Sequence, residues 1–124
     1  MDIKEFGRKG EELAAKHLAG QGYRVLEKNY RTPAGELDIV AEHCGTLVFV
    51  EVKARHGDSY GPPELAVNRH KRRQVERAAL YYIMKSKKDG VPCRFDVVSI
   101  SGAEGTTPRV TVIRDAFELS GGYG

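Results

Sequence analysis

Hydrophobic side chains recur along the chain with two periods, which separate helical from extended segments. Apolar positions three or four residues apart predict a helix over residues 3–20, ended by Gly20-Gln21-Gly22. A second helix is predicted from Asn68, its N-cap, to about Lys88. Shorter apolar runs bounded by turn residues predict strands. The predicted strands are residues 23–30, 36–43, 46–54, 94–100 and 109–114.

The order of these segments, α-β-β-β-α-β-β, predicts an α/β fold with one mixed sheet flanked by helices. A length of 124 residues suits one domain spanning 1–124, with a flexible tail over about 118–124. The Gly- and Pro-rich segment 56–63 is expected to be a loop that is mobile without substrate.

Composition indicates the cellular compartment in which the protein is expected. The two cysteines lack metal-binding spacing and are expected to stay reduced. The N-terminus is charged, unlike a secretory signal, and no segment reaches the about 20 apolar residues of a membrane span. We therefore expect a cytoplasmic protein without membrane association.

Positive charge gathers in the second predicted helix, although the formal net charge of the chain is only +3. The basic residues there are Arg69, Lys71, Arg72, Arg73, Arg77, Lys85, Lys87 and Lys88, against the single acid Glu76. A segment this basic suits a phosphate backbone, and a solvated helix face is the alternative. The candidates for nucleic-acid contacts are Lys71, Arg72 and Arg73, together with Arg55 directly after the third strand.

Two charged residues, Glu51 and Lys53, lie in the otherwise apolar third strand. Strand side chains alternate between faces, so both residues point the same way. If Cys44-Gly45 is a two-residue hairpin turn, Asp38 of the preceding strand stands opposite Glu51. Glu36 then stands opposite Lys53. A three-residue turn would instead put Asp38 on the other face.

Two carboxylates this close repel each other unless one holds a proton or a cation lies between them. A hard divalent cation such as Mg²⁺, with oxygen ligands and waters, is the natural occupant. With Lys53 beside them, Asp38 and Glu51 would form a site for phosphodiester hydrolysis, in which the lysine positions the attacking water or stabilises charge on the phosphate. A buried cluster of salt bridges is the alternative.

The first helix offers a further carboxylate. At about 100° per residue, Glu12 lies opposite the apolar face and is expected to be solvated. Glu11 lies on the edge that turns towards the sheet and is the better candidate for the site. An exposed helix glutamate is the alternative for Glu11.

Motifs spread over nearly the whole chain resemble the YraN-like family, a set of small bacterial proteins that are mostly uncharacterised and predicted to be nucleases. These motifs are G-R-K-G-E-E-L-A (7–14), Gly22-Tyr23, Asn29-Tyr30-Arg31, G-E-L-D-I-V (35–40), L-V-F-V-E-V-K-A-R (47–55), Gly61-Pro62, Ala66-Val67, Lys71 and D-A-F (115–117). The family is similar to the archaeal Holliday junction resolvases and, more broadly, to the PD-(D/E)xK restriction-endonuclease-like superfamily.

The resemblance implies a restriction-endonuclease-like fold and a set of catalytic residues. That set is Asp38, Glu51 and Lys53, with Glu11 as an accessory acid. The resemblance also implies that the backbone carbonyl of Val52 binds metal. Leu37 stands where the name of the superfamily has a proline, which is often absent.

Together these features predict an endonuclease that uses Mg²⁺ or Mn²⁺ and acts on nucleic acid, with DNA favoured over RNA. Branched or flapped DNA is favoured on the resemblance alone. One alternative is a non-catalytic nucleic-acid-binding or interaction module on the same fold. Another is a nuclease directed to RNA. A homodimer would suit symmetric cutting of paired strands, but no residue of the sequence marks a dimer surface.

Overall fold

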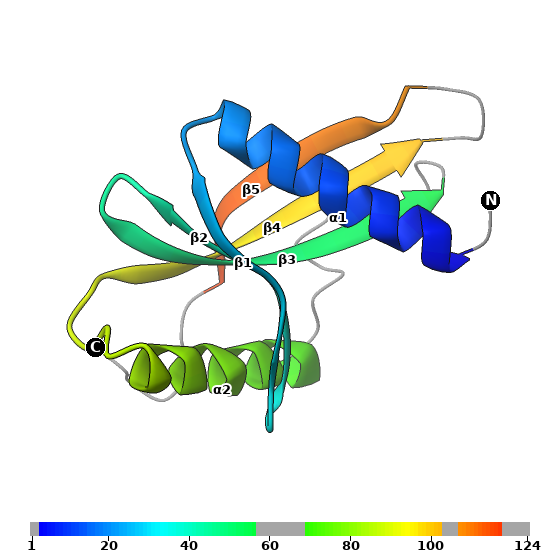
Figure 1. Ribbon diagram of the computed structural model, residues 1–124. Helices are drawn as coiled ribbons and strands as arrows, with labels where there is room; N and C mark the ends of the chain where they lie inside the picture. Colours follow the sequence, from blue (N-terminus) through cyan, green and yellow to red (C-terminus); the bar gives the residue numbers. More distant parts are fainter. Residues whose placement is uncertain (1–2, 57–68, 103–106, 118–124) are drawn as a thin grey trace.

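In the part of the chain that the structure describes, two helices cover opposite faces of a five-stranded sheet (Figure 1). The computed structural model describes residues 3–56, 69–102 and 107–117, with side chains for 9–54, 69–102 and 107–117. The elements are α1 (Ile3–Gly20), β1 (Arg24–Thr32), β2 (Gly35–His43), β3 (Thr46–His56), α2 (Arg69–Lys85), β4 (Cys93–Gly102) and β5 (Arg109–Phe117). The tail 118–124 and, beyond His56, the expected mobile loop 56–63 lie outside the described residues.

The strands lie side by side in the order β1-β2-β3-β4-β5. The pair β3–β4 is parallel and the other pairs are antiparallel. A parallel pair needs a long crossover connection, and α2 lies in the connection between β3 and β4. The expected α/β class, the mixed sheet and the order α-β-β-β-α-β-β are therefore confirmed.

Both helices end where a residue takes a positive φ. Gly22, with φ 90°, ends α1 as the sequence predicts. Lys87 has φ 56°, and the N–H of Lys88 donates to the carbonyl of Ile83 at 3.0 Å. This pattern closes α2 at Lys85, earlier than predicted. Within the described residues, no helix is long and apolar enough to cross a membrane.

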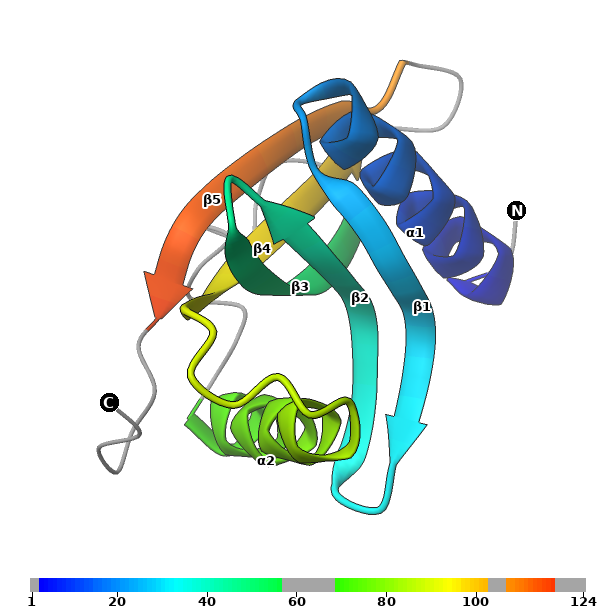
Figure 2. The same ribbon diagram turned by 60° about the vertical axis from the view of Figure 1, so that its left-hand side comes forward.

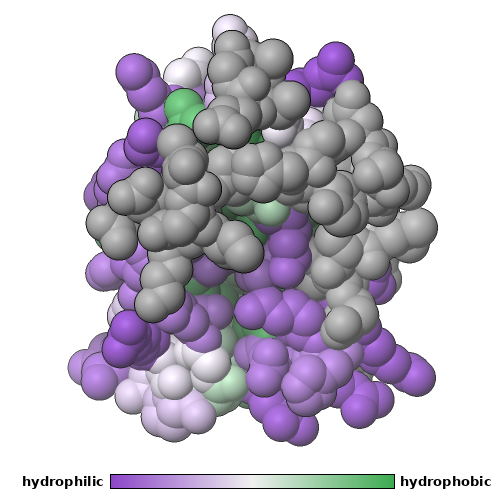
Figure 3. Space-filling view, turned by 90° about the vertical axis from the view of Figure 1, so that its right-hand side faces the viewer, coloured by the Kyte–Doolittle hydropathy of each residue, from purple (hydrophilic) through white to green (hydrophobic). Residues whose placement is uncertain are grey.

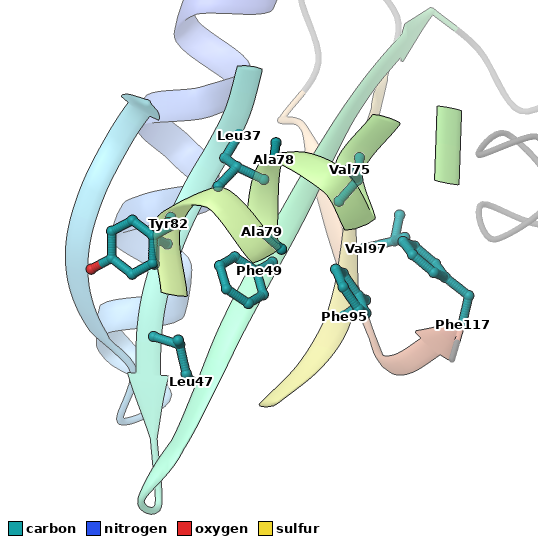
Figure 4. Close-up of a cluster of buried hydrophobic side chains, with 11 residues drawn as sticks. Leu37, Leu47, Phe49, Val75, Ala78, Ala79, Tyr82, Phe95, Val97 and Phe117 are labelled. Carbon is teal, nitrogen blue, oxygen red and sulfur yellow. The ribbon is translucent and has the colours of Figure 1, made fainter. Parts of the chain in front are cut away.

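Buried apolar side chains form one cluster on each face of the sheet. The α1-side cluster is Ala14, Leu18, Tyr23, Ile39, Ala41, Val48, Val50, Val98 and Ile100. The α2-side cluster is Leu37, Val40, Leu47, Phe49, Val75, Ala78, Ala79, Tyr82, Phe95, Val97 and Phe117 (Figure 4). In β3 the even-numbered valines face α1 and Phe49 faces α2, so Glu51 and Lys53 lie on the α2 side.

The turn between β2 and β3 is the two-residue turn that the sequence predicts. Cys44 and Gly45 both have positive φ, 51° and 78°, as a type I′ turn requires. The strands pair from His43 with Thr46 to Ile39 with Val50, which confirms the predicted register.

Strand pairing between β2 and β3 stops at Ile39 and Val50, one residue before the predicted pair of carboxylates. From there β2 stays paired with β1, and the hairpin of these two strands curls away from β3 and alongside α2 (Figure 2). Asp38 and Glu51 are therefore not paired in the ladder, although the register at Ile39 and Val50 leaves them nearly opposite, as expected. The curl buries Leu37 in the α2-side cluster, whereas Ile39 two residues later belongs to the α1-side cluster.

Candidate active site

The departure of β2 from β3 leaves an unpaired edge on β3, and the Asp38 side chain occupies it. In the observed register, the next hydrogen-bonded partner of Val52 would be Leu37. Instead the N–H of Val52 donates to Asp38 Oδ2 at 2.9 Å. The N–H and C=O of one strand residue point towards the same neighbouring strand. The carbonyl of Val52 therefore faces the same gap as the Asp38 carboxylate.

Glu51 is the buried acid of this site. Its side chain is only 5% exposed, and its Oε1 lies 3.8 Å from Lys53 Nζ and 3.4 Å from Lys71 Nζ. Lys53 comes from the same strand, whereas Lys71 reaches in from the first turn of α2. The alternative of a buried cluster of salt bridges would pair Glu36 with Lys53, and these two side chains form no salt bridge in the structure. Glu36 pairs with Arg31 across the β1–β2 hairpin, because that hairpin has left β3.

Burial raises the pKa values of both carboxyl groups. Burial, followed by the charge of Asp38, raises the pKa of Glu51 to about 7, against the opposing effect of the two lysines. Burial also raises the pKa of Asp38, while hydrogen bonds from Val52 and Glu51 and the charge of Lys71 oppose the shift. Without a metal ion, the pair therefore keeps a proton on Glu51 up to near-neutral pH.

Glu11 of α1 faces the same site, as its position on the helix predicts. Glu11 is half-buried, whereas its neighbour Glu12 is exposed. Burial and then the charge of Asp38 raise the pKa of Glu11, and a hydrogen bond with the Asn29 side chain opposes this shift. Asn29 was not predicted to be near the site. Its φ of 53°, which asparagine tolerates better than most residues, is the local signal that could have indicated it.

A divalent cation would find few side-chain ligands here. Among the described residues, no group of three or more His, Cys, Asp or Glu side chains is arranged to hold a metal ion. The oxygens available are the two interacting carboxylates of Asp38 and Glu51 and the Val52 carbonyl. Such a set suits Mg²⁺, which is usually held by one or two carboxylates and keeps several waters.

The predicted nucleic-acid-binding residues separate into three kinds of environment. Lys71 lies at Glu51, inside the site. Arg72 is half-buried, with its guanidinium 5.2 Å from the centroid of the Phe117 ring. Arg73 is exposed on α2. The side chain of Arg55 lies outside the described residues.

The candidate site lies towards the end of the sheet where β3 and β4 finish and where α1 and α2 begin (Figure 1). In the view from that end, the residues drawn in colour are mostly hydrophilic, and a few hydrophobic residues are visible deeper between them (Figure 3).

Family membership follows from the sequence. The model of the uncharacterised protein family UPF0102 matches residues 10–100. The chain belongs to the UPF0102 family. This confirms the YraN-like family that its motifs indicate. The matched range includes every residue placed at the site above, from Glu11 to Lys71.

Relatives of this UPF0102 chain are similar over most of their length. The UPF0102 protein of Desulfosudis oleivorans is 44% identical over 117 residues, which cover 94% of this chain and 93% of the relative. That of Syntrophus aciditrophicus is 46% identical over 117 residues, 94% of this chain and 91% of the relative. That of Thermodesulfovibrio yellowstonii is 48% identical over 97 residues, 78% and 86% of the two chains.

Among solved structures, this UPF0102 chain is similar to Pyrococcus furiosus SfsA in complex with Ca²⁺. The identity is 12% and the TM-score 0.39, with 91% of this chain and 62% of the other covered. A similarity this low identifies neither the fold nor the chemistry of this chain.

Proposed function

We propose that this protein is a metal-dependent endonuclease that hydrolyses phosphodiester bonds in DNA, with branched or flapped DNA as the favoured substrate. The observation that carries the proposal is the pair of interacting carboxylates, Asp38 and Glu51, with the ammonium of Lys53 3.8 Å from Glu51. This is the residue set that the PD-(D/E)xK resemblance implies. The preference for branched DNA rests on that resemblance alone.

Each residue has a distinct role in this proposal. Asp38, Glu51 and the Val52 carbonyl would hold Mg²⁺ or Mn²⁺, which would polarise a phosphoryl oxygen and lower the pKa of a bound water. The ammonium of Lys53, 30% exposed, would stabilise the negative charge that develops on the phosphate. Glu11, with its raised pKa, would accept or donate a proton through a water.

Binding of the remaining nucleic acid would come from exposed cations outside the site. Arg73 and Arg77 are exposed on α2, in the helix that delivers Lys71 to Glu51. A backbone bound along this helix would therefore lead one phosphate towards the site. Exposed arginines contact phosphates without reading sequence, which suits an enzyme that selects DNA by its shape.

The decisive experiment is cleavage of flapped and branched DNA in Mg²⁺ or Mn²⁺, with structured RNA as a comparison. We expect Lys53→Ala to reduce cleavage by at least about 100-fold while DNA binding is largely retained. Asp38→Asn and Glu51→Gln should stop cleavage and weaken divalent-ion binding, because each removes ligand charge. Glu11→Gln should reduce cleavage, whereas the matched control Glu12→Gln should leave it unchanged.

A melting curve of the same variants separates catalysis from structure. If Lys53 only neutralised buried acid, Lys53→Ala would lower stability by roughly 3–5 kcal/mol and would still cut. That result would refute the role of Lys53. If wild type cuts none of a broad set of DNA and RNA substrates, the non-catalytic binding module is the better interpretation. Preferential cleavage of RNA would transfer the proposal to an RNA-directed nuclease.

A further inference from the structure

Lys71 reaches the carboxylate that the proposed metal site would use, although it comes from a different layer of the fold. Its Nζ is 3.4 Å from Glu51 Oε1, closer than the Nζ of Lys53 at 3.8 Å. The Glu51 side chain is 5% exposed, whereas that of Lys71 is 34% exposed. The ammonium therefore extends from the surface to an acid that is almost completely buried.

A divalent cation at Asp38 and Glu51 would meet this ammonium as a competitor. The two positive charges repel each other, and the oxygen that faces Lys71 belongs to the carboxylate that the cation needs. In the metal-free protein, Lys71 thus performs part of the neutralisation that a cation would perform.

A phosphate of the substrate gives Lys71 another partner. The lysine ammonium is a compact charge on a flexible stem, so it can change partners without movement of the helix. A backbone phosphodiester carries one negative charge and two non-bridging acceptor oxygens, as a carboxylate does, but the Glu51 carboxylate already has Lys53 as a second cationic partner. Departure of Lys71 from Glu51 would free that carboxylate for the cation.

We propose that Lys71 neutralises Glu51 in the metal-free protein and transfers to a substrate phosphate when nucleic acid binds, so that nucleic acid and divalent cation bind cooperatively. The inference rests on the proposed metal-dependent nuclease function. Because such coupling is reciprocal, the cation strengthens nucleic-acid binding by the same factor. The site would then favour metal most strongly when substrate is present.

The first measurement is Mn²⁺ affinity of the full chain without nucleic acid, by titration calorimetry at about pH 8. The variants are Lys71→Met, which removes the charge, and Lys71→Arg, which keeps it. The matched control is Arg73→Met, an exposed residue of the same helix. We expect Lys71→Met to bind Mn²⁺ about tenfold more tightly than wild type. The other two variants should stay close to wild type.

The second measurement is the affinity for a branched DNA oligonucleotide with and without Ca²⁺, by fluorescence anisotropy. Ca²⁺ takes oxygen ligands of the same kind, and a gel shows whether the oligonucleotide stays intact. We expect Ca²⁺ to strengthen DNA binding by wild type, and Lys71→Met to lose most of this coupling.

The outcomes distinguish this inference from the nuclease function. Absence of coupling in wild type overturns the inference, whatever the variants do, and so does a Lys71→Met protein with wild-type Mn²⁺ affinity and coupling. Either result leaves the nuclease proposal standing if the wild type cuts DNA. Coupling that depends on Lys71, in a protein that cuts nothing, supports the inference and refutes the nuclease. If Lys71→Met does not fold, Lys71→Gln makes the same test.

Discussion

At the scale of single residues, the site depends on acids that are held where their charge is unfavourable. Glu51 is buried next to Asp38, and the ammoniums of Lys53 and Lys71 offset only part of the cost. The raised pKa values of the two carboxyl groups reflect the cost of burying their negative charge. A protein gains no stability from such an arrangement, which makes these acids candidates for a functional site.

The pH dependence of stability tests the state of Glu51. A pKa raised from 4.5 to about 7 means that, between these values, the folded state holds a proton that the unfolded state has lost. Stability of the metal-free protein should therefore fall as pH rises through this window, on the order of 3 kcal/mol from this group. Urea unfolding at a series of pH values measures it. Glu51→Gln should flatten the profile and be more stable than wild type at about pH 8, and an unchanged profile would contradict the buried acid pair.

At the scale of elements, the approach of α1 to the sheet decides whether Glu11 reaches the site. Gly10, directly before Glu11, is buried, and a Cβ there would lie 3.2 Å from Ala54 Cβ and 3.6 Å from Ile100 Cδ1. The absence of a side chain lets the helix lie close to β3 and β4. A second glycine of the same helix, Gly20 at the end of α1, has no atom within 4 Å of the position of an added Cβ.

These two glycines make a matched pair of substitutions. Gly10→Val should lower the free energy of unfolding by about 1–3 kcal/mol, because the added atoms force α1 away from the sheet. Gly20→Val should change stability much less. Thermal melts of the two variants measure the difference. Cleavage by Gly10→Val should fall more than its stability explains, since Glu11 moves with the helix, and equal effects at both glycines would show that the close packing is unimportant.

In the second helix, the arginine that packs against the protein and the arginines proposed to bind DNA lie on different sides. Arg72 lies over Phe117, whereas Arg73 and Arg77 are exposed. The double variant Arg73→Glu, Arg77→Glu should weaken DNA binding across sequences and reduce the log–log salt slope by about 0.9 for each lost duplex phosphate contact. The comparison is Arg24→Glu, Arg109→Glu, which reverses exposed arginines of β1 and β5. Equal binding by both double variants would show that the face of α2 is merely solvated.

At the scale of the whole molecule, a buried polar network on the α1 side of the sheet ties several elements together. Asp96 of β4 is fully buried and accepts hydrogen bonds from the Tyr23 hydroxyl at 2.8 Å, Arg94 Nε at 3.0 Å and the N–H of Asp115 at 2.9 Å. The His43 ring stacks on Tyr23 at 4.2 Å between centroids. The network thus joins the segment after α1, the β2–β3 hairpin, β4 and β5.

Removal of the central acid should be costly. Asp96→Ala leaves Arg94 and the Tyr23 hydroxyl without their buried partner, and we expect a loss of about 3–5 kcal/mol in the free energy of unfolding. The exposed Asp89→Ala is the control. Chemical unfolding measures both. Catalysis by the folded fraction should persist, because alternation along β4 places Asp96 on the α1 side of the sheet, opposite to Glu51 and Lys53. A loss of activity without a loss of stability would contradict a structural role.

Much of the fold follows from local properties that the sequence determines by itself. The spacing of apolar residues distinguishes helices from strands, and alternation places Glu51 and Lys53 on one face of β3. Cys44-Gly45 sets the hairpin register, because a two-residue turn aligns the strands that flank it. Helix geometry alone selects Glu11 over Glu12. Each of these depends on contacts between residues that are close along the chain.

Only the tertiary structure decided how the site is assembled. The point where β2 leaves β3 depends on the packing of Leu37 against α2. The hydrogen bond from the N–H of Val52 to the Asp38 carboxylate was therefore not predictable from strand alternation. The approach of Lys71 to Glu51 likewise depends on where α2 lies on the sheet. Both are set by the burial of apolar surface between segments far apart in the chain. The energy of such packing depends on contacts in the assembled core, so a local sequence pattern does not predict it.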